Sequence, residues 1–174
     1  MPRPSAREAV LDAYEQTLLE HGPAGVTLEG VAARAGVSKG GLLYHFDSKD
    51  ALLTGLLDRL RSFNDADIEH AKQQPEGVVR YYLESSVSDV TLDSKLHRTT
   101  LAAISMVLAD PRVSEAVRAC TDAWRVELAE HIDDPLAVEL VAAVGDGLYL
   151  RAAMGEGSPE LAKDWNAVLT RLGA

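Results

Sequence analysis

The sequence predicts an all-α protein, with a small three-helix unit at the start and a larger helical region after it. Apolar residues recur with helical spacing along almost the whole chain, and no segment alternates with a two-residue period for long enough to suggest a sheet. Asp110-Pro111, Asp134-Pro135 and Ser158-Pro159 each place a capping residue before a proline at a first helical position. Their wide spacing predicts long helices between them.

The chain of 174 residues has the composition of a folded protein, with 47% hydrophobic and 25% charged residues. No segment reaches the roughly 18 consecutive apolar residues that a membrane span needs. The first ten residues lack the apolar core of a signal peptide. The single cysteine, Cys120, cannot form an internal disulfide. We therefore expect a cytoplasmic protein without a membrane segment.

The net charge of −10 is unevenly distributed. Residues 1–61 carry a net charge of −1, whereas residues 62–174 carry −9. Charges are screened over a Debye length of about 8–10 Å at physiological salt, so the acidic region acts only weakly on a distant binding surface. An acidic chain still opposes non-specific binding to nucleic acid, and any such binding must rely on specific contacts.

The first helix is expected to begin after Ser5, which forms a capping box with Glu8, and to end at the Gly-Pro-Ala-Gly sequence of residues 22–25. Thr27 is a good N-cap for the second helix. The apolar stripe of that second helix consists of Leu28, Val31, Ala32 and Ala35. This spacing indicates a short helix with one buried face.

A tight turn between the second and third helices is the most informative local feature. Gly36 supplies the backbone freedom that a sharp turn needs, and Ser38 is suited to cap the third helix. Residues 27–46 therefore form a helix–turn–helix pattern, which places its second helix in the major groove of DNA. In that helix we expect Leu42 and Phe46 to pack inward.

Ser48 is expected to cap a fourth helix, with Asp50 in its first turn. This helix is rich in leucine and continues through the polar residues 62–72 to a break at Pro75-Glu76-Gly77. We expect four or five further helices after that break.

The helix expected over residues 135–154 is apolar around most of its circumference, which indicates burial on more than one side. A second copy of the chain is the simplest additional burial surface, and the last helix carries one apolar stripe from Leu161 to Leu172. The residues that we expect at a four-helix dimer interface are Val138, Val141, Val144, Leu148, Trp165 and Leu169. The alternative is that both helices fill the core of one subunit.

The segment from Gly25 to Leu52 resembles the TetR family of bacterial transcriptional regulators. The positions that match the spacing of this family are Thr27, Val31, Ala32, Ala35-Gly36-Val37-Ser38, Gly40, His45-Phe46 and Ser48-Lys49. The resemblance implies an all-α homodimer with a three-helix head. It implies a DNA-binding helix–turn–helix domain over residues 1–48 and an effector-binding and dimerisation domain over residues 49–174.

By this resemblance, we expect a repressor that binds a palindromic double-stranded DNA operator as a homodimer and is released by a small-molecule effector. A ligand-independent regulator, or one controlled by a protein partner, is the first alternative. A helical-bundle enzyme that keeps the fold without DNA binding is the second. No catalytic motif or nucleotide-binding glycine pattern occurs, and no spacing of ligands suits a metal. We therefore expect neither enzymatic activity nor a cofactor.

The resemblance also assigns DNA contacts to Thr27, Ser38, Lys39, Tyr44, His45 and Lys49. Hydroxyls and N–H groups at helix starts suit phosphate, and a lysine suits a phosphate or a guanine edge. Gly40 and Gly41 are expected to let the recognition helix approach the groove closely; the alternative is a weak helix held by its neighbours. Leu43 stands where the family usually has tyrosine, and it is suited to contact a thymine methyl.

An effector pocket is expected in the larger region. Its candidate lining residues are Tyr82, Ser86, His97, Leu101, Ile104, Met106, Trp124, Leu128 and Tyr149. Because a pocket needs a few polar groups among apolar walls, His97 and Trp124 are the most informative of these. The alternative for each residue is ordinary core packing.

Overall fold

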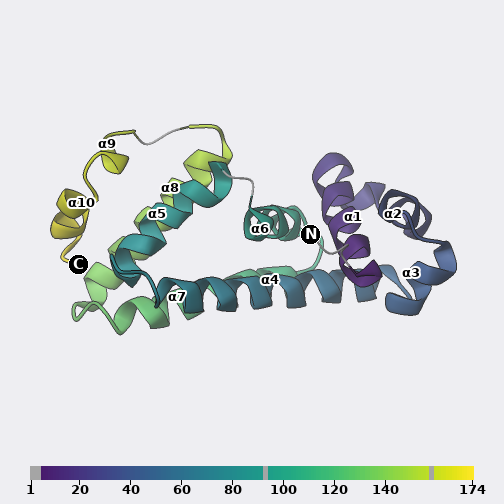
Figure 1. Ribbon diagram of the computed structural model, residues 1–174, viewed down its shortest axis with the longest axis horizontal. Coiled ribbons are helices and arrows are strands. Elements are labelled where there is room, and N and C mark those ends of the chain that lie inside the picture. Colours follow the sequence, from purple (N-terminus) through teal and green to yellow (C-terminus); the bar gives the residue numbers. More distant parts are fainter. Residues whose placement is uncertain (1–4, 92–93, 157–158) are drawn as a thin grey trace. The chain divides into compact units, whose positions relative to one another are not determined.

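The computed structural model describes residues 5–91, 94–156 and 159–174 (Figure 1). In chain order its elements are α1 (Ala6–His21), the short 3-10 helix η1 (Pro23–Gly25), α2 (Leu28–Ala35), α3 (Lys39–His45), α4 (Lys49–Ala71), α5 (Val78–Thr91), α6 (Lys95–Ile104), α7 (Pro111–Ala129), α8 (Pro135–Ala153), α9 (Pro159–Ala162) and α10 (Trp165–Leu172). These described residues contain helices and no strand, which confirms the predicted all-α class.

Side chains cap several helices at the predicted places. Ser5 accepts a hydrogen bond from the N–H of Glu8 at 3.3 Å, and Ser48 accepts one from the first turn of α4 at 3.0 Å. Asp134 accepts one from the first turn of α8 at 2.9 Å. Each cap satisfies an N–H group that has no partner within its own helix. The cap predicted at Ser158 lies outside the described residues.

The chain divides into two compact units, each with its own packing. Unit 1 comprises the chain up to Ser62 together with Arg98–Val117. Unit 2 comprises Phe63–His97 and Arg118–Ala174. The helix–turn–helix segment thus belongs to unit 1, whereas α5, α8 and α10 belong to unit 2.

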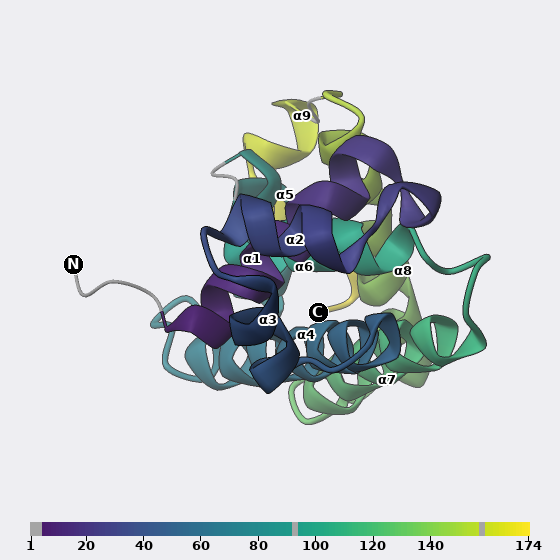
Figure 2. The ribbon, with the colours of Figure 1, turned by 90° about the vertical axis from the view of Figure 1, so that its right-hand side faces the viewer.

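Helices α1, α2 and α3 pack against one another in unit 1 (Figures 1 and 2). Their apolar side chains share one core with the first half of α4. The fully buried members of this core include Val10, Leu11, Leu18, Val31, Leu42, Leu52 and Leu56. Each such side chain contributes roughly 1.5–3 kcal/mol relative to an exposed one, so this core holds the helix–turn–helix in place.

The ring of Phe46 packs directly on Gly55 of α4. A Cβ atom added to Gly55 would lie 2.7 Å from Cε1 of Phe46 and 3.2 Å from Cδ2 of Leu11. Glycine therefore lets the end of α3 approach the second turn of α4. A lone glycine in a leucine-rich helix is the sequence signal of such a close approach.

An ion cluster centred on the buried Arg59 and Glu15 joins α1, α4 and α6 within unit 1. The guanidinium of Arg59 donates to Glu8 at 2.5 Å, to Asp12 at 2.7 Å and to Glu15 at 2.8 Å. The hydroxyl of Thr99, which is fully buried, donates to the Glu15 carboxylate at 2.7 Å. Buried charges persist only when they are paired and hydrogen-bonded, so this cluster constrains how the three helices meet.

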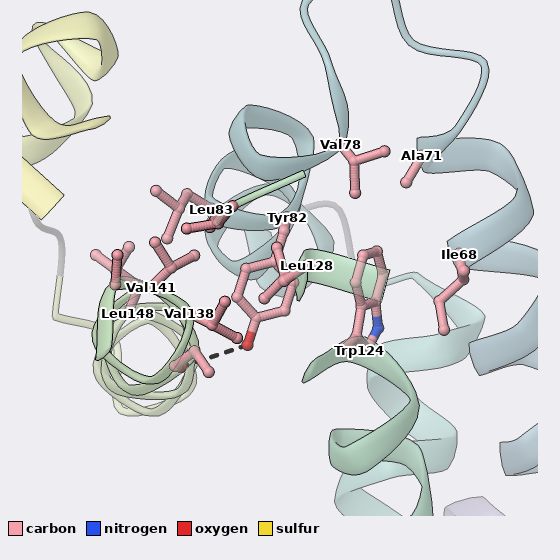
Figure 3. Packing of buried hydrophobic residues seen from close by; sticks show 13 residues of the cluster. Ile68, Ala71, Val78, Tyr82, Leu83, Trp124, Leu128, Val138, Val141 and Leu148 are labelled. Atoms are coloured by element: carbon pink, nitrogen blue, oxygen red, sulfur yellow. Dashed lines mark hydrogen bonds between the residues drawn. The ribbon is translucent and has the colours of Figure 1, made fainter. Parts of the chain in front are cut away.

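Unit 2 is centred on the packing of α5 along α8, as the close view in Figure 3 shows. The Tyr82 ring lies 5.0 Å from the ring of Trp124, and its hydroxyl donates to the carbonyl of Ala142 at 3.4 Å. A side chain at Gly145 would overlap the Tyr82 ring. The same cluster includes Ile68, Val78, Leu83, Leu128, Val138, Val141 and Leu148.

The prediction of one continuous last helix is wrong. α9 ends at Ala162, and α10 starts separately because the Asp164 side chain accepts a hydrogen bond from the N–H of Ala167 at 3.0 Å. A capping aspartate competes with helix continuation in this way. Six helices rather than four or five therefore follow the break at residues 75–77 within the described part of the chain.

We predict that Gly55→Ala lowers the free energy of unfolding by about 1 kcal/mol. Overpacking against Phe46 costs roughly 1–3 kcal/mol, and the gain in helix propensity of up to about 1 kcal/mol offsets only part of it. Urea denaturation measures the difference. Gly40→Ala is the matched control, because a Cβ atom there meets nothing within 4 Å and should not destabilise the protein. An unchanged stability of Gly55→Ala would contradict the packing argument.

Candidate DNA-binding interface

The turn between α2 and α3 depends on Gly36, which has a left-handed conformation with φ of 68°. The N–H groups of Gly36 and Val37 donate hydrogen bonds to the last carbonyls of α2. The N–H of Val37 donates to the carbonyl of Ala32 at 3.1 Å. This is the glycine-dependent helix end that the sequence predicted. The chain then reverses within two residues and begins α3.

Two hydroxyl side chains fix the starts of the paired helices. Thr27 accepts a hydrogen bond from the N–H of Gly30 at 3.0 Å, and Ser38 accepts one from the N–H of Gly41 at 3.0 Å. Both residues are exposed, so each hydroxyl can form a further hydrogen bond with a group outside the protein. Such helix starts are suited to phosphate oxygens.

α3 has a buried side and an exposed side. Leu42 and the flanking Phe46 are 0% and 3% exposed, which confirms that they pack inward. Tyr44 is 85% exposed and Leu43 is 38% exposed. Lys39, Gly40 and His45 are also exposed, as is Lys49 at the start of α4. The residues predicted to contact DNA are thus available on the surface of unit 1.

The two glycines of α3 differ in their surroundings. A Cβ atom on Gly40 would meet nothing within 4 Å, so its surface is open. A Cβ atom on Gly41 would lie 3.2 Å from Oγ of Ser38, which is a tight contact with the capping group. Gly40 therefore leaves room for a close-approaching partner, whereas Gly41 also serves the local cap.

An ion pair crosses from α2 to α3 on this surface. The Lys39 ammonium donates to the Glu29 carboxylate at 2.6 Å, and this bond lowers the pKa of Glu29. Both side chains are more than half exposed, so the pair is solvated and adds little stability. Sequence reasoning missed Glu29, although its place in the first turn of the preceding helix is a usable signal.

A second ion pair holds α2 against α1. The guanidinium of Arg34 makes two hydrogen bonds to the carboxylate of Glu20, one of them at 3.0 Å. The bonds lower the pKa of Glu20 and raise that of Arg34. A two-bond arginine–carboxylate pair fixes the relative orientation of the two side chains as well as the distance between them.

The candidate effector residues are divided between the two units. Tyr82, Trp124 and Leu128 belong to the packed core of unit 2. His97 lies 2.9 Å from the Tyr149 hydroxyl through Nδ1, and Ser86 donates to the carbonyl of Tyr82 at 2.8 Å. The remaining candidates, Leu101, Ile104 and Met106, fall in unit 1.

Three of the six candidate dimer residues face the interior of unit 2, and the other three are partly buried. Val138, Val141 and Leu148 are 6%, 0% and 3% exposed, and they pack within the subunit. Val144, Trp165 and Leu169 are partly buried against the same core. The exposed apolar side chains of α8 are instead Leu136, Leu140 and Leu150 at 65%, 45% and 60% exposure. Periodicity identified α8 as apolar all round but could not say which side α5 covers.

Comparisons with known proteins agree with this architecture. The family model for bacterial regulatory proteins of the tetR family matches residues 10–56, and the model for a tetracyclin repressor-like C-terminal domain matches residues 76–174. The HTH-type transcriptional regulator BetI of Burkholderia cenocepacia is 29% identical over 172 residues, covering 90% of this chain and 89% of that relative.

Solved structures show the same fold. A TetR-family member from Streptomyces coelicolor A3 has a TM-score of 0.77 at 23% identity. The multidrug binding protein EbrR, complexed with malachite green, has a TM-score of 0.74 at 24% identity. Each likeness covers 98% of this chain and 99% of the other. At these identities the likeness concerns the fold alone.

The chain belongs to the TetR family of bacterial transcriptional regulators, and it is a DNA-binding regulator. The part of the chain that the structure describes contains no helix long and apolar enough to cross a membrane. The same residues bring together no group of three or more side chains suited to a metal ion.

We predict that Gly36→Ala lowers the free energy of unfolding by about 1 kcal/mol, because a left-handed backbone costs roughly 1–2 kcal/mol at a residue with a Cβ atom. Gly36→Asn is the matched variant, since asparagine tolerates this conformation better. Urea denaturation should rank stability as wild type, Asn variant, Ala variant. Equal losses in both variants would show that the backbone conformation at position 36 is not the cause.

Proposed function

We propose that this protein is a repressor that binds a palindromic operator as a homodimer and is released by a small-molecule effector. The observation that carries the DNA-binding part is the exposed surface of α3, which includes Tyr44, Lys39 and His45. The buried Leu42 fixes the orientation of that side. A rigid helix with exposed polar groups at its start suits the major groove.

Individual roles follow from the placement of each group. We assign phosphate contacts to Thr27, Ser38 and Lys49, which lie at three helix starts. We assign base-edge contacts to Lys39, Tyr44 and His45, which lie along α3. The open surface of Gly40 permits close approach, the lack of a side chain at Gly41 assists it, and Leu43 offers an apolar contact to a thymine methyl.

We propose that residues 1–48 act as the DNA-binding domain and that residues 49–174 bind the effector and dimerise. Contacts group the first part of α4 with α1–α3, since Leu52, Leu53 and Leu56 are buried in unit 1. α4 therefore stabilises the DNA-binding helices while also continuing into unit 2.

For the dimer we propose a surface on the exposed side of α8, named here the α8 stripe. It consists of Leu136, Leu140, Ala143, Gly147 and Leu150, spaced at three and four residues. Such spacing forms one continuous apolar face on a helix, and exposed faces of this kind mark interfaces. The buried Val138, Val141 and Leu148 support the stripe from within.

The proposed effector site lies in unit 2 near His97 and Tyr149. Their hydrogen-bonded pair supplies polar groups beside the apolar cluster that holds Tyr82, Trp124 and Leu128. EbrR, which shares the fold, is a multidrug binding protein, and this supports a ligand-responsive body. The tight packing of Tyr82 on Trp124 favours the alternative of a ligand-independent regulator, because a ligand would have to separate them.

Selection of duplexes from a random DNA pool tests the proposal directly. The enriched sites should be palindromic, and each should bind two chains with at least about a thousandfold preference over random DNA, within the usual range of specificity. Leu43→Ala should relax the preference at one base pair of each half-site. An absence of enrichment, or asymmetric sites that bind one chain, would contradict the proposal.

We predict that Glu29→Gln strengthens DNA binding about threefold at low salt. The change removes a negative charge from the interface and frees Lys39 from its ion pair. Fluorescence anisotropy with the selected duplex measures the change, which should shrink as salt rises. Glu76→Gln makes the same charge change in the loop before α5 and should have little effect. Equal strengthening by both variants would assign the effect to net charge alone.

We predict that Leu140→Glu weakens dimerisation at least tenfold, because an interface cannot bury an unpaired carboxylate without cost. Sedimentation equilibrium measures the dissociation constant. Leu108→Glu is the control, since Leu108 is exposed in unit 1 and lies outside the α8 stripe. An unchanged dimer in Leu140→Glu would place the interface elsewhere.

A further inference from the structure

Unit 1 contains a groove that shares only Lys49 with the proposed DNA contacts and none of its lining residues with the effector site proposed in unit 2. It has a volume of about 200 Å³ and lies among α1, η1, the start of α4 and the segment that joins α6 to α7. All of these parts belong to unit 1. The candidate effector site near His97 belongs to unit 2, so the two sites are distinct.

The walls of this groove are apolar. Leu18, Val26 and Leu53 are 1%, 3% and 4% exposed, and they approach it from α1, the end of η1 and α4. Met106 contributes a flexible thioether that adapts to the shape of a ligand. Apolar walls of this kind favour a ring or a short hydrocarbon over water.

One polar group lies within the apolar walls. The Tyr14 side chain is 2% exposed, and within the described residues its hydroxyl donates to Sδ of Met106 at 3.3 Å. A thioether is a weak acceptor, so this buried donor has an unusually poor partner. Burial, with a smaller effect of Asp110, raises the pKa of Tyr14 to about 12. The hydroxyl therefore remains a donor at neutral pH.

The rim of the groove carries balanced charges. Arg112 donates to Asp50 at 2.6 Å and to Asp110 at 2.8 Å, which joins the start of α7 to the first turn of α4. Lys49 also lies on the rim, so two cationic groups stand beside two carboxylates. A ligand with a net charge gains little from such a rim, and a neutral ligand is favoured.

We propose that this groove binds a neutral, single-ring aromatic molecule whose carbonyl oxygen accepts a hydrogen bond from Tyr14. The apolar walls hold the ring, and the carbonyl replaces the weak thioether acceptor. The volume suits one ring with a small substituent, because an apolar cavity of about 150 Å³ in another protein holds benzene. The bound molecule lies against the first turn of α4, beside Lys49.

Methionine methyl NMR tests this proposal with acetophenone as the probe. The sequence has three methionines, and Met106 lies in the groove whereas Met154 lies at the end of α8 in unit 2. We expect the Met106 methyl resonance to shift with saturation while that of Met154 stays in place. A site confined to unit 2 would leave Met106 unmoved.

Two variants identify the contacts. Tyr14→Phe keeps the ring and removes the donor, and it should raise the dissociation constant of acetophenone about fivefold, the effect of one lost hydrogen bond. Val26→Phe should abolish the saturable shift by filling the groove. Tyr81→Phe is the matched control, since it removes a hydrogen-bonded tyrosine hydroxyl from unit 2 and should leave acetophenone binding in the groove unchanged.

The proposal is overturned by either of two results. One is a Met106 shift that does not saturate up to the solubility limit of acetophenone. The other is equal binding by wild type, Tyr14→Phe and Val26→Phe. Thermal unfolding of each variant checks that it is folded, and either folded groove variant is sufficient for the decision.

Discussion

The presentation of α3 depends on the burial of Leu42 and Phe46 in the core of unit 1. These two side chains determine which side of a seven-residue helix faces outward, because so short a helix is not stable by itself. Gly55 allows Phe46 to approach α4, and Gly36 allows α2 to end beside α3. The exposed Tyr44 is therefore held by contacts on the opposite side of its helix.

The charged residues of unit 1 have two different roles, one in holding helices together and one in the proposed contact with DNA. Arg59 is itself buried, pairs with three carboxylates of α1 and joins helices within unit 1, whereas Lys39 is paired with one solvated carboxylate, that of Glu29. A solvated pair exchanges its partner readily, and the Glu29 carboxylate can be replaced by an acceptor on a base edge of DNA. An acidic chain with such a surface binds DNA through a few placed groups and not through bulk charge.

The sequence predicted features that arise from neighbouring residues, and it missed those that arise between distant ones. Ser38, Gly36 and Asp134 act as expected because a cap or a turn involves residues only a few positions apart. The Arg59 cluster joins residues 44 to 84 positions apart, which no local pattern reveals. Tertiary packing also decides which side of α8 is covered by α5. Helical periodicity alone therefore could not show that Leu140 is exposed and Val141 is buried.

Hydrogen exchange of the protein with and without a palindromic duplex tests the central claim most directly, because it reports which backbone amides DNA covers. We expect slower exchange across α3, from Lys39 to His45, and at the first turn of α4, with unit 2 little changed. Protection confined to unit 2, or none in α3, would contradict the assignment of this helix as the part that reads DNA.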